Sequence, residues 1–241
     1  MSMFGLFTVE HSHRWRSMCR NTLLAICASM PVAAAAATPL KQLPADALDL
    51  HFERNVTDND AELVLKVTSG LDLDRLEVVG PSGQVISSFS GTLLGPIGFT
   101  KFATETTEPT LREIQKQYPE GKYKVFLKAA DGTRYAGRAT LKDTMPNAPV
   151  ISTPLPAAAL STDGFRIEWF PVAGAQRYKI VVEQEDEALV LSADAPAGAS
   201  RFEVPNGWLL PGRKYVVGVS AVGDNRNVSV SEIFVHTNSD P

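Results

Sequence analysis

Four groups of residues in this sequence have the types and spacing that chemistry would need. The first is His51, which lies between Asp49 and Glu53 at alternate positions, an arrangement that suits a metal ligand or a general base. Zinc sites in proteins hold three or four N, S or O ligands, and both cysteines lie far away in the first 37 residues. We therefore interpret these three residues as the solvated polar face of one strand, and interpret His236 in the same way.

The second group is acidic. Asp58, Asn59 and Asp60 form a polar loop, with Glu62 close behind them. Calcium is bound by several oxygen ligands of this kind, but the loop lacks the glycine and the final glutamate of an EF-hand. Asx residues also cap turns without any ligand. We therefore favour turn capping for this loop and keep Asp58 and Asp60 as candidate ligand-binding residues.

The third group is a pair of carboxylates, Glu105 and Glu108, of the kind that glycosidases use. The two lie three residues apart, next to Pro109. That position predicts a loop and the start of a helix, where negative charge is favoured. We therefore favour the structural interpretation of this pair.

The fourth group is a single residue, Trp208, which follows Asn206 and Gly207 at a turn. An exposed tryptophan at a turn can stack on a sugar or a peptide. Alternatively, its ring covers one end of a β-sandwich, as aromatic residues near such corners commonly do. We therefore favour a packing role for Trp208 and keep it as a candidate ligand-binding residue.

The elements that must position these residues are mostly strands. Apolar and polar residues alternate, as is typical of half-buried strands, over 48–52, 63–67, 76–79, 84–86, 122–128 and 135–141. Turn residues follow two of these strands, at Gly80–Gly83 and at Asp131–Gly132, and the second pair is a strong hairpin signal. Short strands without a βαβ rhythm predict a β-sandwich.

One short helix interrupts the strands. Thr110 and Glu113 have the spacing of a capping box. Leu111, Ile114 and Tyr118 then fall on one helical face. The loop over residues 91–98 is rich in glycine and is expected to have little regular structure.

The second half of the chain is organised around residues 165–183. Phe165, Ile167 and Trp169 alternate with charged residues, so they are expected to point inward. A turn rich in proline and glycine follows, and then a second alternating strand begins at Tyr178. The proline-rich segment Met145–Pro149 separates this half from the first.

The second half resembles a fibronectin type III domain over residues 146–237. The residues that carry the resemblance are Pro149–Ile151, Trp169, Pro171–Ala175, Tyr178, Phe202–Pro205, Leu209–Tyr215, Val217–Ala221 and Asn227–Ser229. The pairing of residues 184–200 departs from the pattern and stays open. The resemblance implies a β-sandwich and no activity.

The first half is similar, more loosely, to the Ig-like domain of uncharacterised exported bacterial proteins. The matching segments are Glu53–Ala61, Thr104–Pro109, Tyr118–Tyr123 and Met145–Pro149. In such domains the hydroxyl of a tyrosine placed like Tyr123 bonds back to the corner backbone. We therefore expect an all-β protein of two tandem sandwiches, with an Ig-like domain over 38–144 and a fibronectin type III domain over 145–241.

Residues 1–37 are interpreted as a signal peptide. Three arginines precede a short apolar run, which ends in a string of alanines with cleavage expected near Ala37. The apolar run is too short to span a membrane, and Met18 is an alternative start. Cys19 and Cys27 both lie in this segment, so no disulfide or thiol chemistry is expected after cleavage. This pattern fits a bacterial periplasm or the extracellular space.

Charge and composition narrow the function further. The chain has 23 basic and 27 acidic residues and no basic run, which argues against nucleic-acid or anionic-membrane binding. We therefore expect a non-enzymatic binding, adhesion or spacer module of the cell envelope, without cofactor or metal. Its expected partner is another envelope or extracellular protein, with a carbohydrate also possible.

Two alternatives stay open. One is a periplasmic chaperone-like protein that receives a strand from its partner. The other is a protein that binds or processes carbohydrate, in which Trp208 and the segment around Glu105 and Glu108 would serve.

Overall fold

The computed structural model describes residues 39–91, 99–185 and 190–239. The predicted signal peptide and nearly all of the glycine-rich loop at 91–98 lie outside these residues. Thr38–Pro241 form one compact unit, and its described residues are mostly β-structure, as the sequence predicts.

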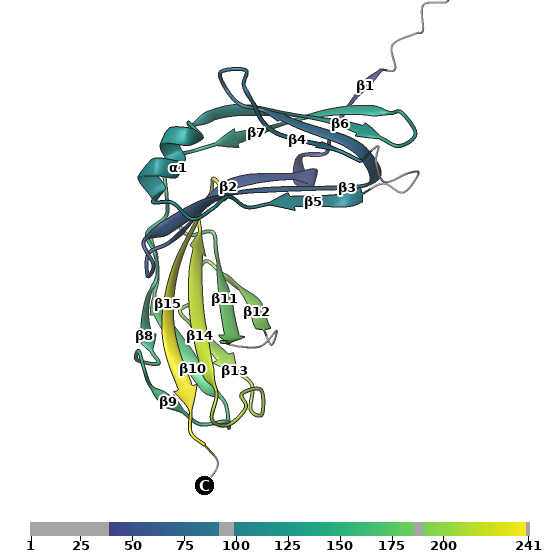
Figure 1. Cartoon of the computed structure of the whole chain (residues 1–241). Helices are drawn as coiled ribbons and strands as arrows, with labels where there is room; N and C mark the ends of the chain where they lie inside the picture. The colour runs from purple at the N-terminus through teal and green to yellow at the C-terminus, as the bar shows by residue number, and fades with distance from the viewer. Residues whose placement is uncertain (1–38, 92–98, 186–189, 240–241) are drawn as a thin grey trace, which may run out of the picture. The chain divides into compact units, whose positions relative to one another are not determined.

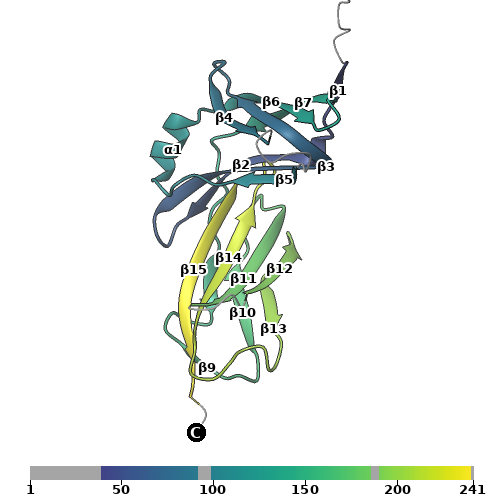
Figure 2. The same cartoon turned by 45° about the vertical axis from the view of Figure 1, so that its right-hand side comes forward.

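The N-terminal half is a sandwich of two layers (Figures 1 and 2). One layer contains β2 (Leu48–Asn55), β5 (Phe99–Thr104) and the first part of β3 (Asp60–Val79). The other contains the second part of β3 with β4 (Val85–Ser90), β6 (Gly121–Ala129), β7 (Arg134–Leu141) and β1 (Leu40–Gln42). Apolar side chains fill the space between the layers, among them Phe52, Leu76 and Val125.

Strand β3 belongs to both layers. Residues 60–67 pair with β2, whereas residues 73–79 pair with β6 and residues 75–79 with β4. The register shifts between Leu73 and Arg75, as it does where a strand bends from one sheet into another. The sequence pattern predicted two separate strands here. The structure joins them into one of 20 residues.

The predicted turns and helix of this half are confirmed. At the Asp131–Gly132 turn the Thr133 amide donates to the Asp131 carboxylate at 2.8 Å, and Gly132 has φ +83°. Helix α1 (Leu111–Gln117) begins at Thr110, whose amide donates to the Glu113 carboxylate at 3.0 Å. In the described residues, neither α1 nor the short 3₁₀ turn η1 (Ala45–Ala47) is long and apolar enough to cross a membrane.

The C-terminal half has the fold of a fibronectin type III domain, as the sequence resemblance implied. Strands β13 (Arg201–Val204), β10 (Phe165–Phe170) and β8 (Val150–Thr153) form one sheet. The facing strands are β12 (Val190–Pro196), β11 (Arg177–Gln184), β14 (Lys214–Val222) and β15 (Val228–Thr237), with β9 (Ala159–Leu160) pairing to β15. Strand β12 resolves the pairing that the sequence left open, because it adds to the free side of β11.

The stretch 165–183 packs as its alternation predicts. Ile167 and Trp169 of β10 are buried, as are Tyr178, Ile180 and Val182 of β11. The rings of Trp169 and Tyr178 lie 5.3 Å apart across the core. The packing of the two sheets accounts for these inward residues, so this stretch defines the fold and offers no site.

Three buried tyrosines close backbone corners with their hydroxyl groups. Tyr123 donates to the Pro119 carbonyl at 2.9 Å, as the sequence predicts. Tyr178 accepts from the Val172 amide, and Tyr215 from the Leu210 amide, both at 2.7 Å. Each ring is fully buried, so each of these corners is tied directly to a core.

These two sandwiches have separate cores, one built from residues 43–141 and one from residues 160–235. The division of the chain into domains at residues 144 and 145 stays a prediction.

Replacing Tyr215 by Phe is expected to lower the free energy of unfolding by about 1–2 kcal/mol, because the Leu210 amide loses its acceptor while the ring still fills the core. Urea denaturation followed by tryptophan fluorescence measures this change. The matched control is Tyr118→Phe, whose hydroxyl meets only the exposed Gln117 amide at 3.4 Å among the described residues and should cost little. Equal stabilities for the Tyr215→Phe variant and the parent would contradict the corner assignment.

Candidate functional site

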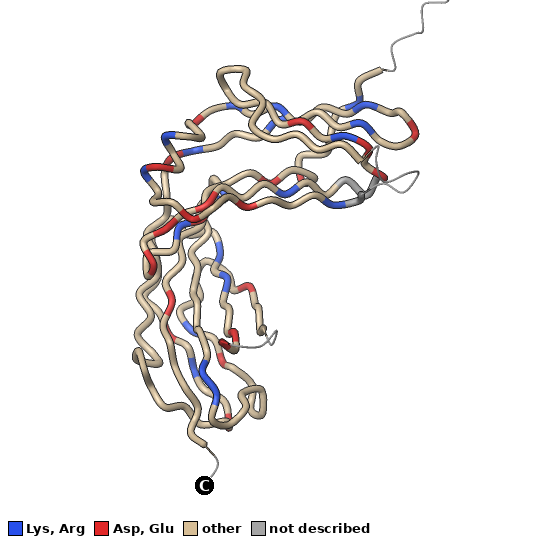
Figure 3. Tube along the Cα trace, in the orientation of Figure 1, with Lys and Arg blue, Asp and Glu red and all other residues tan. Residues whose placement is uncertain are grey.

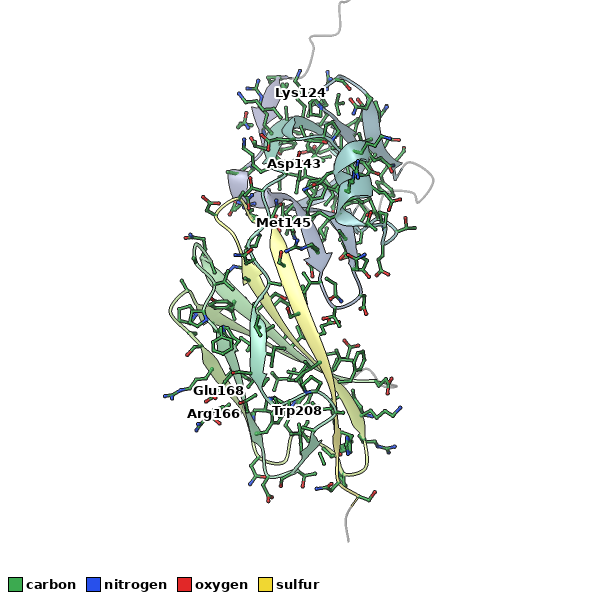
Figure 4. The ribbon with its side chains drawn as sticks, turned by 90° about the vertical axis from the view of Figure 1, so that its left-hand side faces the viewer. Lys124, Asp143, Met145, Arg166, Glu168 and Trp208 are labelled. Carbon is green, nitrogen blue, oxygen red and sulfur yellow. The ribbon has the colours of Figure 1, made fainter. Side chains whose placement is uncertain are left out.

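Two of the three candidate ligand-binding residues lie close together in the structure, and the third lies in another part of the chain. Asp58 and Asp60 line the same cavity, of about 240 Å³. Trp208 lies in the C-terminal sandwich (Figure 4). It is half-buried there, with its ring 6.1 Å from that of Tyr215, in the packing position that the sequence analysis gave as its alternative. A ligand-binding role for Trp208 stays a prediction.

We call the cavity the acidic cleft, because six carboxylates line it. They are Glu53, Asp58, Asp60, Glu62, Glu108 and Glu232. Five of them come from β2, from β3, from the turn between these strands and from the segment before α1, where red segments gather in Figure 3. The sixth, Glu232, comes from β15.

The floor of the acidic cleft is the outer face of β11 and β14. Gly218 lies there between its register partners Val181 and Glu232, which leaves a hollow because glycine has no side chain. Lys179 provides the cation in the lining. The cleft is therefore strongly negative over a small polar floor.

Hydrogen bonds of Asn55 and Thr57 hold the turn that carries Asp58. The Asn55 amide donates to Asp58 at 3.0 Å and to Glu232 at 2.9 Å. The Thr57 hydroxyl accepts from the Glu232 amide at 2.8 Å. These bonds fix the β2–β3 turn against β15 and leave Asp60 at the cleft without such a tie to β15.

Burial, and after it the crowding of the carboxylates, raises several pKa values in the acidic cleft. Burial raises the pKa of Glu62 to about 7, and the charges of Glu105, Glu53 and Glu108 add to the effect. Glu53 lies directly opposite Glu62 in the β2–β3 register, a pairing of like charges that destabilises a sheet. Burial likewise raises the pKa of Glu232 and of Asp60. The Glu62 carboxyl group in the cleft is therefore expected to hold a proton up to nearly neutral pH.

The chemistry of the cleft is limited by its geometry. Over residues 39–91, 99–185 and 190–239, no three His, Cys, Asp or Glu side chains gather in a way that could hold a metal ion. Asp58 is bonded to Asn55, as in a capped turn. The described residues therefore add no ligand set for the calcium alternative considered for Asp58 and Asp60, and their role as candidate ligand-binding residues stays a prediction.

The prediction that His51 lies on a solvated strand face is wrong. Only 6% of His51 is exposed, and its Nδ1 lies 3.0 Å from an Asp49 oxygen. The β14–β15 turn lies over this end of β2, because Arg226 donates to the Leu48 carbonyl at 2.9 Å. The hydrogen bond with His51 lowers the pKa of Asp49 against the effect of burial. His51 is thus a packed structural residue.

Glu105 and Glu108 lie on the segment before α1, as their position next to Pro109 predicts. Glu108 lines the acidic cleft, and both carboxylates act on the pKa of Glu62. The pair therefore contributes negative charge to the same place as Asp58 and Asp60. No pattern in the sequence indicated that these distant acidic groups would meet.

A second functional feature, missed in the sequence, is a buried polar junction around Asn227. This side chain is fully buried. Its oxygen accepts from the Phe52 amide at 2.9 Å, and its nitrogen donates to the carbonyls of Lys142 at 2.7 Å and Thr144 at 2.8 Å. One side chain of the C-terminal half thereby satisfies backbone groups on two segments of the N-terminal half.

Neighbouring residues extend this junction. Ser229, also fully buried, donates to the Pro146 carbonyl at 2.8 Å and accepts from Arg54 at 3.3 Å. Residues 228–230 of β15 pair in parallel with residues 53–55 of β2, so backbone pairing crosses from one sandwich to the other. The Asn227–Ser229 pattern was visible in the sequence only as the opening of a strand.

No protein-family model matches the sequence, and no curated protein matches it. A segment of two fibronectin type III domains from chicken tenascin is 15% identical and covers 78% of this chain and 97% of its own, with a TM-score of 0.32. The fn3 domain of human collagen alpha-1(XX) is 20% identical over 41% of this chain and 88% of its own, with a TM-score of 0.31.

The FN1–FN3 domains of chicken CNTN1 are 14% identical over 83% of this chain and 66% of their own, also with a TM-score of 0.31. These TM-scores are low. The fold assignment therefore rests on the strand order and the packing of residues 150–237 described above.

The raised pKa of Glu62 predicts a pH-dependent stability. Because its folded pKa of about 7 exceeds the ordinary value of 4.5, the folded state keeps a proton that the unfolded state releases between these values. The free energy of unfolding is therefore expected to fall as the pH rises from about 4.5 to about 7, and Glu62→Gln should flatten that fall. Denaturant titrations across this range provide the measurement.

The matched control is Asp46→Asn, which removes an exposed carboxylate outside the cleft and should leave the profile unchanged. A Glu62→Gln variant with the same pH profile as the parent would show that Glu62 is not held protonated.

Proposed function

We propose that this protein is an exported, non-enzymatic binding or spacer module of the bacterial envelope, in which the two sandwiches act as one rigid body. Domains of the fibronectin type III type are in general binding, adhesion or spacer modules. The observation that carries the proposal is the buried junction around Asn227. A module that must present a surface at a set distance needs such a fixed joint.

The energetics of the junction support rigidity. Domains in one chain move relative to each other by default, unless their interface is extensive. Here a buried amide has its oxygen and both its donors engaged with backbone groups, and separating the halves would exchange these three hydrogen bonds for bonds to water. Each such exchange costs about 0.5–1.5 kcal/mol net. Opening the joint is therefore costly before any apolar contact is counted.

Export is part of the proposal and is supported by residues 1–37, whose arginines, short apolar run and alanine string are typical of a signal peptide. Intact-mass measurement of the protein recovered from the periplasm or the medium tests it, with a chain beginning near residue 38 expected. Recovery of the uncut chain in the cytoplasm would contradict export.

Strand β12 supports a second candidate, a chaperone-like protein that receives a partner strand. It ends the order of its sheet, and Val190 at its start is 49% exposed. However, Asp194 forms an ion pair with Arg177 at 3.0 Å, and Pro196 ends the strand. Charged residues and proline on an edge strand protect it from the addition of another strand. We therefore prefer the rigid module.

Replacing Asn227 by Ala is expected to lower the free energy of unfolding by about 2–4 kcal/mol, because the Phe52 amide and the Lys142 carbonyl lose their partner in a buried place. It should also split one calorimetric transition into two, as the sandwiches begin to melt separately. Differential scanning calorimetry of the full chain measures both effects.

The control for this variant is Asn238→Ala, at an exposed position beyond β15, which should leave one transition near the parent temperature. Two independent transitions in the parent protein would contradict the rigid-body proposal. Turnover of any substrate in a hydrolase panel by the parent protein would contradict its non-enzymatic part.

A further inference from the structure

The outer face of β3, β6 and β7 gathers basic side chains that are scattered in the sequence. We call it the basic face. It consists of the exposed residues Arg75, Lys122, Lys124, Lys128, Arg134 and Arg138. Blue segments lie along these strands in Figure 3, and Lys124 lies at the outer surface in Figure 4. A chain with an excess of acidic residues thus carries one strongly positive surface.

The register arranges these residues in rows across the strands. Arg75, Lys128 and Arg134 are direct neighbours in one row, and Lys124 and Arg138 are neighbours in another. Because outward side chains on one strand repeat about every 6.8 Å, the two rows lie about 14 Å apart. The row between them is largely uncharged and holds Phe126 and Ala136 beside Glu77.

These pairings cost stability. Like charges directly opposite each other on neighbouring strands destabilise a sheet. Lys128 is partly compensated by Asp74, at 2.8 Å, and Arg75 by Glu77, at 3.4 Å. Within the described part of the chain, no ion pair reaches the other row, Lys124 and Arg138. An anionic ligand across the rows would relieve this repulsion.

The middle row adds an apolar contact and an acceptor. Phe126 is 36% exposed and lines a shallow depression of about 490 Å³ together with Glu77, Arg75, Lys128 and Arg134. Opposite Phe126, Ala136 is too small to fill the space. The depression can therefore receive a ring against Phe126, with cations on the adjoining row.

We propose that the basic face binds an acidic polysaccharide. Its carboxylates would lie on the two cationic rows, and an uncharged part of a sugar ring would pack on Phe126. The Glu77 carboxylate can accept hydrogen bonds from sugar hydroxyls. This proposal adds a ligand class to the binding module proposed above and places it on the N-terminal sandwich.

Two features favour a polysaccharide over single-stranded nucleic acid. Nucleic-acid grooves use successive aromatic side chains as stacking platforms, whereas Phe126 is the single aromatic residue among the outward positions of β3, β6 and β7. The Glu77 carboxylate would also repel any anionic group placed in the depression between the rows, whereas a sugar presents hydroxyl groups that can donate to it. The ligand is therefore expected to carry hydroxyl groups at this point.

The test uses fluorescein-labelled polygalacturonate and the full chain, titrated by fluorescence anisotropy over a series of salt concentrations. Binding of the parent is expected, with an affinity that falls as salt rises. Lys124→Gln with Arg138→Gln should raise Kd at least about tenfold and lower the slope of log K against log salt by about two, one for each cation removed. Phe126→Ala should raise Kd several-fold and leave the slope unchanged.

The matched control is Arg112→Gln with Lys116→Gln, which removes one arginine and one lysine from exposed positions on α1 and should leave Kd unchanged. Circular dichroism melting shows that each variant is folded. Absence of binding by the parent at about 50 mM salt, or equal Kd values for the Lys124/Arg138 variant and the parent, would overturn the proposal.

Polyglutamate and a single-stranded oligonucleotide test the ligand class. Tighter binding of either than of polygalacturonate would overturn the assignment to a polysaccharide. These outcomes are independent of the calorimetric test of the Asn227 junction, so a failure of the basic face and a failure of the rigid module can be told apart.

Discussion

The buried amide of Asn227 is the interaction on which the arrangement of this molecule depends. It has no exposed surface, and its oxygen and both its donors are bonded to backbone groups of the other half. A buried amide without partners would destabilise the protein, so the segments around Phe52, Lys142 and Thr144 must meet it together. The parallel pairing of β2 with β15 and the position of the β2–β3 turn follow from that meeting.

The acidic cleft is a consequence of the same meeting. The β2–β3 turn brings Asp58 and Asp60 over β15, where Glu232 is already half-buried. Carboxylates that would not repel one another on separate surfaces then share one cavity, and the pKa of Glu62 rises to about 7. The shift is explained by burial and crowding and is not by itself a sign of catalysis. Its first consequence is for stability.

The alternation of side chains along the strands places basic and acidic residues on different surfaces of the molecule. A net charge of −4 suggests a uniformly acidic protein. Yet every second residue of β6 points outward, and three of those four positions hold lysine. The register then sets Arg134 and Arg138 of β7 opposite two of these lysines. Positive and negative residues that balance along the chain are therefore separated on its surface, where a partner would meet them.

Much of the fold follows from the sequence. The alternation in 165–183, the Asp131–Gly132 turn, the helix after Thr110 and the bond from Tyr123 to its corner are all confirmed. Each depends on residues a few positions apart, whose geometry the local backbone determines. Even the error at β3 is a local one, since both its ends were identified and only the bend between them was missed.

The sequence by itself determined the β-sandwich class and the core residues of the second half, because strand periodicity is a local property. The fibronectin type III character of that half was implied by a resemblance of its motif residues. Only the tertiary structure decided which charged residues become neighbours. His51 is buried on a face of β2 where Arg226, 175 residues later, lies 3.8 Å from Asp49, and Glu62 meets Glu108 across the cleft. These contacts join positions that are far apart in the chain. They depend on strand register and on the Asn227 junction, and neither the register nor the junction produces a periodic pattern in the sequence.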